Sequence, residues 1–330
     1  MFFQEEQDNA GASEIESGAA CKQASRWAAS AQYRFLDALM ADPQIQYEQI
    51  AFHGGTSLHF SWRSPRLSED LDFLIARSAA DLNTIVMRAG QKLAETFRAE
   101  DPQFTLEIQD RTRQEERMIS FDLRVTHAAY LGKALIKVEF WRVSPEYLAQ
   151  YPVELRSPIQ PGEMISRISN PVPAATLESA YCDKLTALAT RPYLKWRDIF
   201  DLWWIGTQTD ARLDLLSVTR QFLHNVSAYQ TIDGLSPAQA LRKFLAKDPD
   251  ELLEKADPDL RRWLPQAFWD KMRKRFILAR RDVGVAGANP VIPTILFSGR
   301  SMPACSSSAA RSGSPAFKRS CKRVMRASNS

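Results

Sequence analysis

The chain has 330 residues, 45% hydrophobic and 25% charged, which is enough for one large or two moderate globular domains. Its longest apolar runs, such as Ile199–Ile205, fall far short of the roughly 20 residues that a membrane-spanning helix needs, so no membrane association is expected. The formal net charge is +4, but residues 298–330 hold seven basic residues and no acidic one. Subtracting these seven charges leaves −3 on residues 1–297. Nucleic-acid binding would therefore need a local basic patch or the tail itself.

The N-terminal residues and the cysteines indicate the cellular compartment of the protein. Five acidic residues precede the first basic residue, Lys22, which is the opposite of a secretory leader. The four cysteines and four histidines show no metal-ligand spacing, which argues against a zinc site or a disulfide framework. We expect a cytoplasmic protein.

Apolar periodicity predicts an α+β protein with a small mixed sheet followed by helices. The expected elements, in chain order, are a packing helix at 24–40, a strand, glycine turn, short helix and strand over 47–76, a helix at 79–100, and strands at 118–126 and 134–142. After Pro145, strand signals mostly vanish and helices are expected to about Arg281.

These patterns divide the chain into four expected regions. They are an N-terminal extension and helix at 1–44, a sheet-containing core at 45–150, a helical domain at 151–288, and a basic, serine-rich tail at 289–330. The tail is expected to be disordered because its composition buries little apolar surface.

The segment from Asp70 to Phe73 is the most informative part of the sequence. Side chains alternate along a strand, so Asp70 and Asp72 share one face while Leu71 and Phe73 share the other. Two like charges on one face favour a divalent cation between them, and Mg²⁺ bound by carboxylates and phosphate oxygens is typical of phosphoryl transfer. A solvated pair of acids at a strand edge is the alternative.

Two glycines strengthen the first interpretation. Gly54 and Gly55 lie between a strand and a short helix, where bare backbone N–H groups can approach a triphosphate. An ordinary turn is the alternative. A third carboxylate could complete a two-metal site, and Glu139 is preferred to Asp122 for this role.

The helical half contributes a second cluster of charged residues. Lys184 falls on the stripe that a helix at this position would bury, so its ammonium either reaches solvent or meets an anion such as an NTP phosphate. Asp198 and Asp201 lie one turn apart at the start of the next helix, where acids commonly cap the first turn.

Four motifs in this order resemble those of the AbiEii/AbiGii-type nucleotidyltransferase toxin family. They are Gly-Gly-Thr-x-Leu at 54–58, Arg-x-Ser-x-Asp-Leu-Asp-Phe at 66–73, Asp-Lys-Leu at 183–185 and Arg-Asp-x-x-Asp-Leu at 197–202. The similarity spans about residues 45–210. The resemblance implies a fold like that of the DNA-polymerase-β-like nucleotidyltransferases, with Mg²⁺ or Mn²⁺ as cofactor and an NTP as substrate.

The resemblance also implies roles for individual residues. Asp70 and Asp72 would hold metal. The motifs do not fix the third acid, for which the strand pattern favours Glu139. Nucleotide contacts would come from Gly54, Gly55, Thr56 and Ser68 on the first motifs, and Lys184 with Asp198 would complete the nucleotide site.

Family biology suggests a toxin of a toxin–antitoxin or phage-defence system, with a cognate antitoxin as partner and RNA, in particular the tRNA 3′ end, as acceptor. Two other interpretations stay open. One is an NTP-binding protein without catalysis, and the other is transfer of the nucleotide to a protein or a small molecule.

Overall fold

The computed structural model describes residues 26–79, 81–113, 117–159, 170–191, 193, 195–208, 213–226 and 249–283. These residues form two compact units. The first contains the described residues up to Ala180 together with Leu260–Asp270, and the second contains those from Tyr181 to Asp259 and from Lys271 onward. The tail at 289–330, for which disorder is expected, lies outside the described residues.

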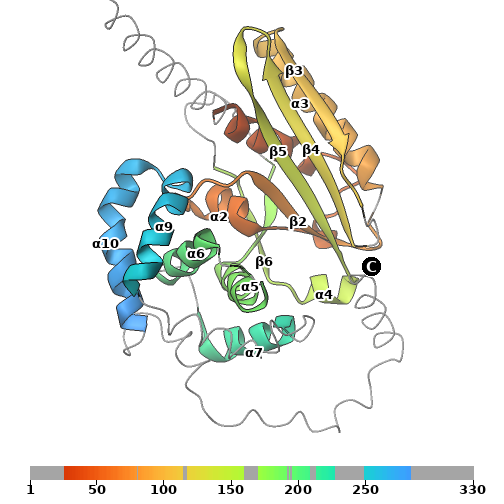
Figure 1. Ribbon diagram of the computed structural model, residues 1–330. Coiled ribbons are helices and arrows are strands. Elements are labelled where there is room, and N and C mark those ends of the chain that lie inside the picture. Colours follow the sequence, from red (N-terminus) through yellow and green to blue (C-terminus); the bar gives the residue numbers. More distant parts are fainter. Residues whose placement is uncertain are drawn as a thin grey trace, which may run out of the picture. The chain divides into compact units, whose positions relative to one another are not determined.

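A seven-stranded mixed sheet organises the first unit, in the order β3-β4-β5-β2-β1-β7-β6 (Figure 1). The strands are β1 (Ile50–His53), β2 (Asp70–Ala76), β3 (Phe104–Asp110), β4 (Met118–His127), β5 (Tyr130–Val143), β6 (Val153–Arg156) and β7 (Val172–Ala175). β2 runs parallel to β5, and β1 runs parallel to β7, whereas the other neighbouring pairs are antiparallel. The predicted α+β class is confirmed.

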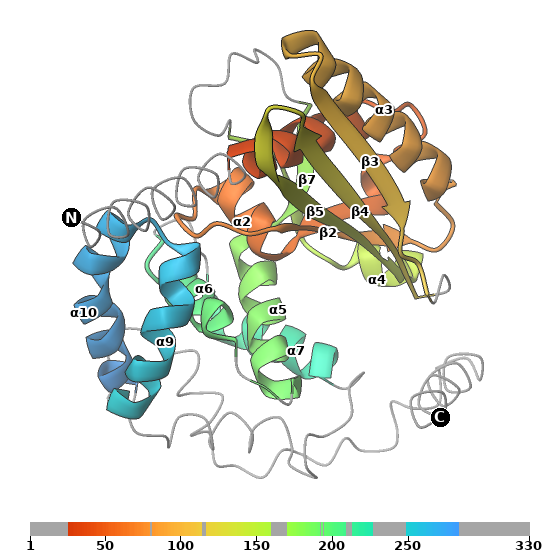
Figure 2. The same cartoon turned by 45° about the horizontal axis from the view of Figure 1, so that its top comes forward.

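The hydrophobic core of this unit lies between one face of the sheet and the helices packed on it. The helical elements are a helix at 26–40, η1 (Tyr47–Gln49), α2 (Gly54–Trp62), α3 (Leu82–Glu100) and α4 (Pro145–Ala149). Helix α3 runs alongside the strands next to β3 (Figure 2). Within the core, the ring of Phe73 on β2 stacks on Phe52 of β1 at 5.1 Å and on Phe140 of β5 at 5.0 Å. This stack helps to fix the register of three neighbouring strands.

Three strands of the sheet were not expected from the sequence. β3 is an edge strand whose apolar residues are only partly buried, and β6 is a short edge strand with an exposed outer face. β7 contains Pro173, which argues against a strand when the sequence alone is considered. The sheet therefore continues past residue 150, where the helical domain was expected to begin.

The described part of the second unit contains helices and no strand. The helices are α5 (Leu177–Thr190), α6 (Trp196–Gly206), α7 (Leu215–Val226), α9 (Pro249–Trp263) and α10 (Gln266–Val283), of which α5, α9 and α10 also contribute residues to the first unit. Helix α6 packs on α10 through Trp203 and Phe276, whose rings lie 5.6 Å apart.

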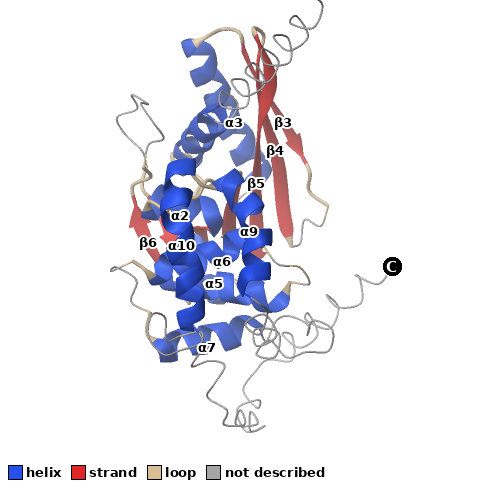
Figure 3. Ribbon diagram, turned by 60° about the vertical axis from the view of Figure 1, so that its left-hand side comes forward, coloured by secondary structure: helices blue, strands red, loops and turns tan. Residues whose placement is uncertain are grey.

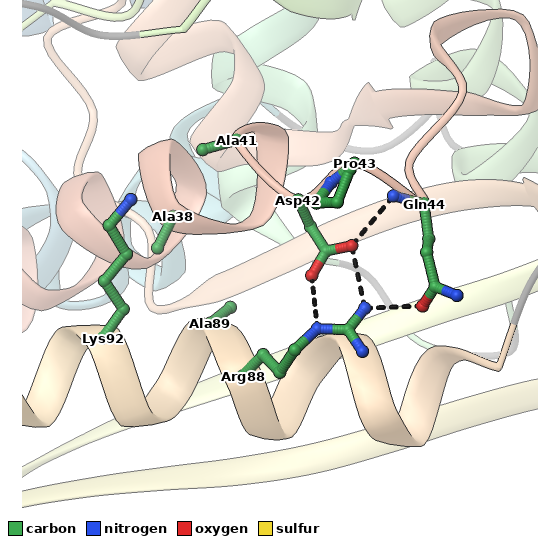
Figure 4. Close-up of a pocket in the computed structure, with 8 residues that line it drawn as sticks. All are labelled: Ala38, Ala41, Asp42, Pro43, Gln44, Arg88, Ala89 and Lys92. Carbon is green, nitrogen blue, oxygen red and sulfur yellow. Dashed lines mark hydrogen bonds and ion pairs between the residues drawn. The ribbon is translucent and has the colours of Figure 1, made fainter.

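A cavity of about 470 Å³ opens in the first unit between the end of the 26–40 helix and α3 (Figure 4). Arg88 on α3 donates from Nε and Nη2 to the two carboxylate oxygens of Asp42 at 2.8 and 2.9 Å, and also to Gln44. Small and apolar side chains make up much of the remaining lining. None of the motif residues lines this cavity, so it is not the site that the sequence motifs indicate.

Candidate functional site

Strand pairing places the motif carboxylates in neighbouring positions on one face of the sheet. Asp70 and Asp72 are both half-buried on β2, on the face opposite the buried Leu71 and Phe73. In the parallel pairing of β2 with β5, Asp72 lies opposite Glu139. Because neighbouring strands are about 4.8 Å apart, these two carboxylates start from adjacent backbone positions.

Asp122, the alternative third acid, is placed differently. It lies on β4, where it pairs with Lys137 of β5, and is thus one strand further from β2. Its carboxylate accepts a hydrogen bond from Arg111 Nε at 2.9 Å. The geometry therefore favours Glu139 over Asp122 as the partner of Asp70 and Asp72.

Gly54 is required by both backbone conformation and packing. Strand β1 ends at His53, and Gly54 begins α2 with a φ of +79°, which L side chains rarely adopt. A Cβ at this position would lie 2.4 Å from Asp72 Oδ2. The glycine therefore lets the Asp72 carboxylate pack directly against the start of α2.

Gly55 makes room for the guanidinium group of Arg66. A Cβ there would lie 2.1 Å from Arg66 Nη2 and 3.0 Å from Ser68 Oγ. Arg66 is only 1% exposed, and its Nη1 donates to the carbonyl oxygen of Leu67 at 2.9 Å. The buried Arg66, which the sequence argument left without a role, positions the loop that leads into β2.

Protein side chains pack against the glycine turn, and its contact with a nucleotide stays a prediction. The space beside both glycines is occupied by protein side chains, and the buried Thr56 donates its hydroxyl to the backbone oxygen of Asp70. No side chain caps the N-terminus of α2. Any phosphate contact at this turn would therefore come from the backbone N–H groups of the first helical turn.

His53 is a second residue to which the sequence argument gave no role. It lies opposite Asp72 in the antiparallel pairing of β1 with β2, so one row across three strands contains His53, Asp72 and Glu139. The position of this histidine, directly before the two glycines, is the feature of the sequence that could have indicated a place in the site.

Lys184 lies in a buried cluster of charges in the second unit. Its Nζ lies 2.7 Å from Asp198 Oδ1 and 2.9 Å from Asp201 Oδ2. The side chains of Lys184, Asp198 and Asp201 are 12%, 6% and 0% exposed. Arg191 forms a further ion pair with Asp198, and its side chain is 38% exposed.

This arrangement resolves the two alternatives for Lys184 in an unexpected way. Its ammonium meets an anion, but the anions are two carboxylates of the same unit. Asp198 lies in the first turn of α6, where no side-chain capping hydrogen bond is found, and the carboxylates of Asp198 and Asp201 both pair with Lys184. The one-turn spacing of Asp198 and Asp201 was the signal in the sequence; capping of the helix was one interpretation, and the nucleotide-site role that the resemblance implies for Asp198 stays a prediction.

The loop before α6 concentrates positive charge around this cluster. Burial lowers the pKa of Lys195, and the neighbouring guanidinium groups of Arg191 and Arg197 lower it further, whereas Asp198 opposes the shift. Cations outnumber carboxylates among these residues, which is an electrostatic environment suited to an anionic ligand.

A family model described as the AbiEii nucleotidyl transferase toxin of type IV toxin–antitoxin systems matches residues 34–295. The chain belongs to this AbiEii family. It is therefore a nucleotidyltransferase, as the motifs predicted. The match includes residues of both compact units.

The solved structure of MenT4 agrees with the fold of this AbiEii member. MenT4, a nucleotidyltransferase toxin from Mycobacterium tuberculosis, is similar over 82% of this chain and 89% of its own, with 22% identity and a TM-score of 0.50. JHP933 from Helicobacter pylori is similar over 82% of this chain and 91% of its own, with 17% identity and a TM-score of 0.47. No curated protein sequence matches the chain. Within the described residues, no helix has the length and apolar character needed to cross a membrane.

Proposed function

We propose that this nucleotidyltransferase moves the nucleoside monophosphate of an NTP onto an RNA acceptor, with the tRNA 3′ end as the expected site. The observation that carries the proposal is the register of β1, β2 and β5. It sets Asp70, Asp72 and Glu139 on one face of the sheet, beside the N-terminus of α2.

These three carboxylates would hold Mg²⁺ or Mn²⁺. Among the described residues, no three His, Cys, Asp or Glu side chains are gathered closely enough to ligate a metal by themselves. Mg²⁺ usually takes one or two carboxylates and completes its shell with water and substrate phosphates, so the row suits an ion that arrives with the nucleotide. The ion would neutralise charge on the phosphates and on the attacking oxygen.

The chain's own residues have distinct parts in the transfer. The acceptor hydroxyl oxygen bonds to the α-phosphorus, the bond from that phosphorus to the bridging oxygen breaks, and pyrophosphate leaves with the bonding electrons. We assign the hydroxyl proton to Glu139, which lies on the β5 side of the row. The backbone N–H groups at the start of α2 face the phosphates from the β1 side.

The resemblance also assigns Lys184 and Asp198 to nucleotide binding, and we retain both in the proposal. Lys184 is neutralised by two carboxylates, whereas Arg191 is the more exposed cation of the cluster. Phosphate contact in this cluster is therefore expected mainly from Arg191, with Lys184 holding Asp198 and Asp201 in place.

The family description supports part of the biological role that we propose. We infer that the activity is counteracted by an antitoxin, that it operates in the cytoplasm, and that it contributes to phage defence. The family's place in type IV toxin–antitoxin systems supports the first inference.

Incubation of the purified protein with each α-labelled NTP, Mg²⁺ or Mn²⁺ and total RNA tests the proposal. Label should accumulate in RNA, should need the metal, and should be lost in Asp72→Asn. Label in protein or in a small molecule would contradict the RNA acceptor, and NTP binding without transfer would contradict catalysis.

A further inference from the structure

The outward face of β5 carries an exposed tryptophan close to the carboxylate row. Side chains alternate along this strand, so Lys133, Lys137 and Trp141 share the face of Glu139. The side chain of Trp141 is 45% exposed, and no ring or hydrogen-bond partner for it is found among the described residues. An indole with nearly half of its surface exposed is available to a partner outside the unit.

Its position relative to the carboxylates is fixed by strand register. Trp141 lies opposite Leu74 of β2 and Met118 of β4, two residues beyond Glu139 and therefore about 7 Å further along the strand. A single nucleotide whose sugar lies at Glu139 could therefore place its base on the indole of Trp141.

The charges on the same face are unevenly compensated. Arg111 pairs with Asp122 at 2.9 Å, and Arg124 pairs with Glu107 at 3.1 Å. Lys133 and Lys137 are exposed and form no ion pair or hydrogen bond with any described residue. Both lysines lie along β5, on the other side of Glu139 from Trp141. Lys137 has Asp70 of β2 and Asp122 of β4 as cross-strand neighbours, whereas Lys133 lies opposite Thr126 of β4.

On this face a second core cluster, with Leu148 of α4, covers Leu74 and Ala76 of β2, whereas the β3–β5 part of the face is more exposed. Helix α3 packs on the opposite face of β3–β5 (Figure 3). On the outward face, Leu135 is 37% exposed, between the two lysines. Phosphates of the donor nucleotide are assigned to the start of α2, on the β1 side of β2, which leaves the β5 side for the acceptor.

We propose that β5 is the acceptor-binding strand, with Trp141 stacking on the terminal base of a single-stranded RNA end and Lys137 and Lys133 contacting its phosphates. An aromatic platform combined with cations that follow the backbone is how proteins hold single-stranded nucleic acid. The two lysines are four residues, or about 13 Å, apart, which suits two phosphate steps of an extended strand. This inference rests on the proposed function and names the residues that position its acceptor.

RNA affinity, measured without NTP, tests this assignment separately from catalysis. The probe is a fluorescein-labelled single-stranded RNA with a free 3′ hydroxyl, and the readout is anisotropy at several salt concentrations. Trp141→Ala should weaken binding by about tenfold or more, and Trp141→Phe should restore most of it. Lys137→Gln should make the salt dependence shallower by about one unit of slope.

Matched controls and a second readout separate the outcomes. Met87→Ala removes another exposed apolar side chain, on α3, and Lys92→Gln removes another exposed lysine, so both should bind RNA like the wild type. NTP affinity should be unchanged in Trp141→Ala, and Asp72→Asn should lose transfer while still binding RNA. Wild-type RNA affinity in both Trp141→Ala and Lys137→Gln would overturn the inference, as would weakened NTP affinity in Trp141→Ala. If the wild type binds RNA but transfers no label to it, the proposed function is contradicted and the inference about RNA binding is not.

Discussion

Gly54 has a hydrogen atom where alanine would have a methyl group, and this leaves room for the carboxylate of Asp72. The φ of +79° and the 2.4 Å approach of Asp72 Oδ2 both exclude a Cβ. Gly54→Ala should therefore displace Asp72 and lower the transfer rate by about 10²-fold, since small misplacements of catalytic groups have effects of this size.

A second glycine provides the control for this substitution. Gly90→Ala, on α3, meets Cδ1 and Cγ1 of Ile108, which is not part of the carboxylate row, so its transfer rate should stay near that of the wild type. Initial rates with labelled NTP compare the two variants. A normal rate in Gly54→Ala would show that Asp72 does not act from the position seen here.

The Lys184 cluster makes a different prediction, because its partners are buried carboxylates. Lys184→Met leaves Asp201, which is 0% exposed, without this cation, and should lower the free energy of unfolding by about 3 kcal/mol. Urea denaturation measures the change. Lys271→Met, at an exposed position of α10, is the control and should have little effect. Equal stability of the two variants would show that the ion pairs contribute nothing measurable.

At the scale of elements, the Asp42–Arg88 pair ties the end of the 26–40 helix to α3. Hydrogen bonds from Arg88 lower the pKa of Asp42, so the folded protein takes up this proton at a lower pH than the unfolded chain. The stabilisation is therefore complete above the unfolded pKa of about 4 and is lost as the pH falls through the lower folded value.

This linkage can be measured with one substitution. Asp42→Asn should be less stable than the wild type at neutral pH, and the difference should shrink as the pH falls below about 4. Urea denaturation between neutral and acidic pH gives both free energies. Asp270→Asn, which removes a half-exposed partner of Arg261, should show only a small difference at every pH. A difference for Asp42→Asn that does not change with pH would contradict the role of its charge.

The elements also show what the sequence could predict. Alternation placed Asp70 and Asp72 on the polar face of a strand, and Glu139 on a second one, because period-two burial is a local property. The pairing of β2 with β5 joins residues almost 70 positions apart, and no local pattern specifies it. The packing of Asp72 and Arg66 against the glycine turn also joins residues that are distant in the sequence, as does the ion pair of Lys184 with Asp201. No local pattern specifies these side-chain contacts either.

At the scale of the whole molecule, the family match ends at residue 295, whereas residues 298–330 carry seven basic residues. Deletion of residues 296–330 should leave the transfer rate close to that of the full chain and make the salt dependence of RNA binding shallower. Rates and binding isotherms on the two proteins check both expectations. Loss of transfer on truncation would show that the tail is part of the catalytic machinery.

The central claim is that the carboxylate row on β2 and β5 carries out nucleotidyl transfer. Its most direct test is the initial rate of label transfer from α-labelled NTP to RNA in Asp72→Asn, which keeps the shape of the side chain and removes its charge. We predict a rate at least 10²-fold below that of the wild type, on the order of 3 kcal/mol in activation free energy, with an unchanged melting temperature. A variant that retains more than about a tenth of the wild-type rate would differ by less than about 1.4 kcal/mol, and would contradict the assignment.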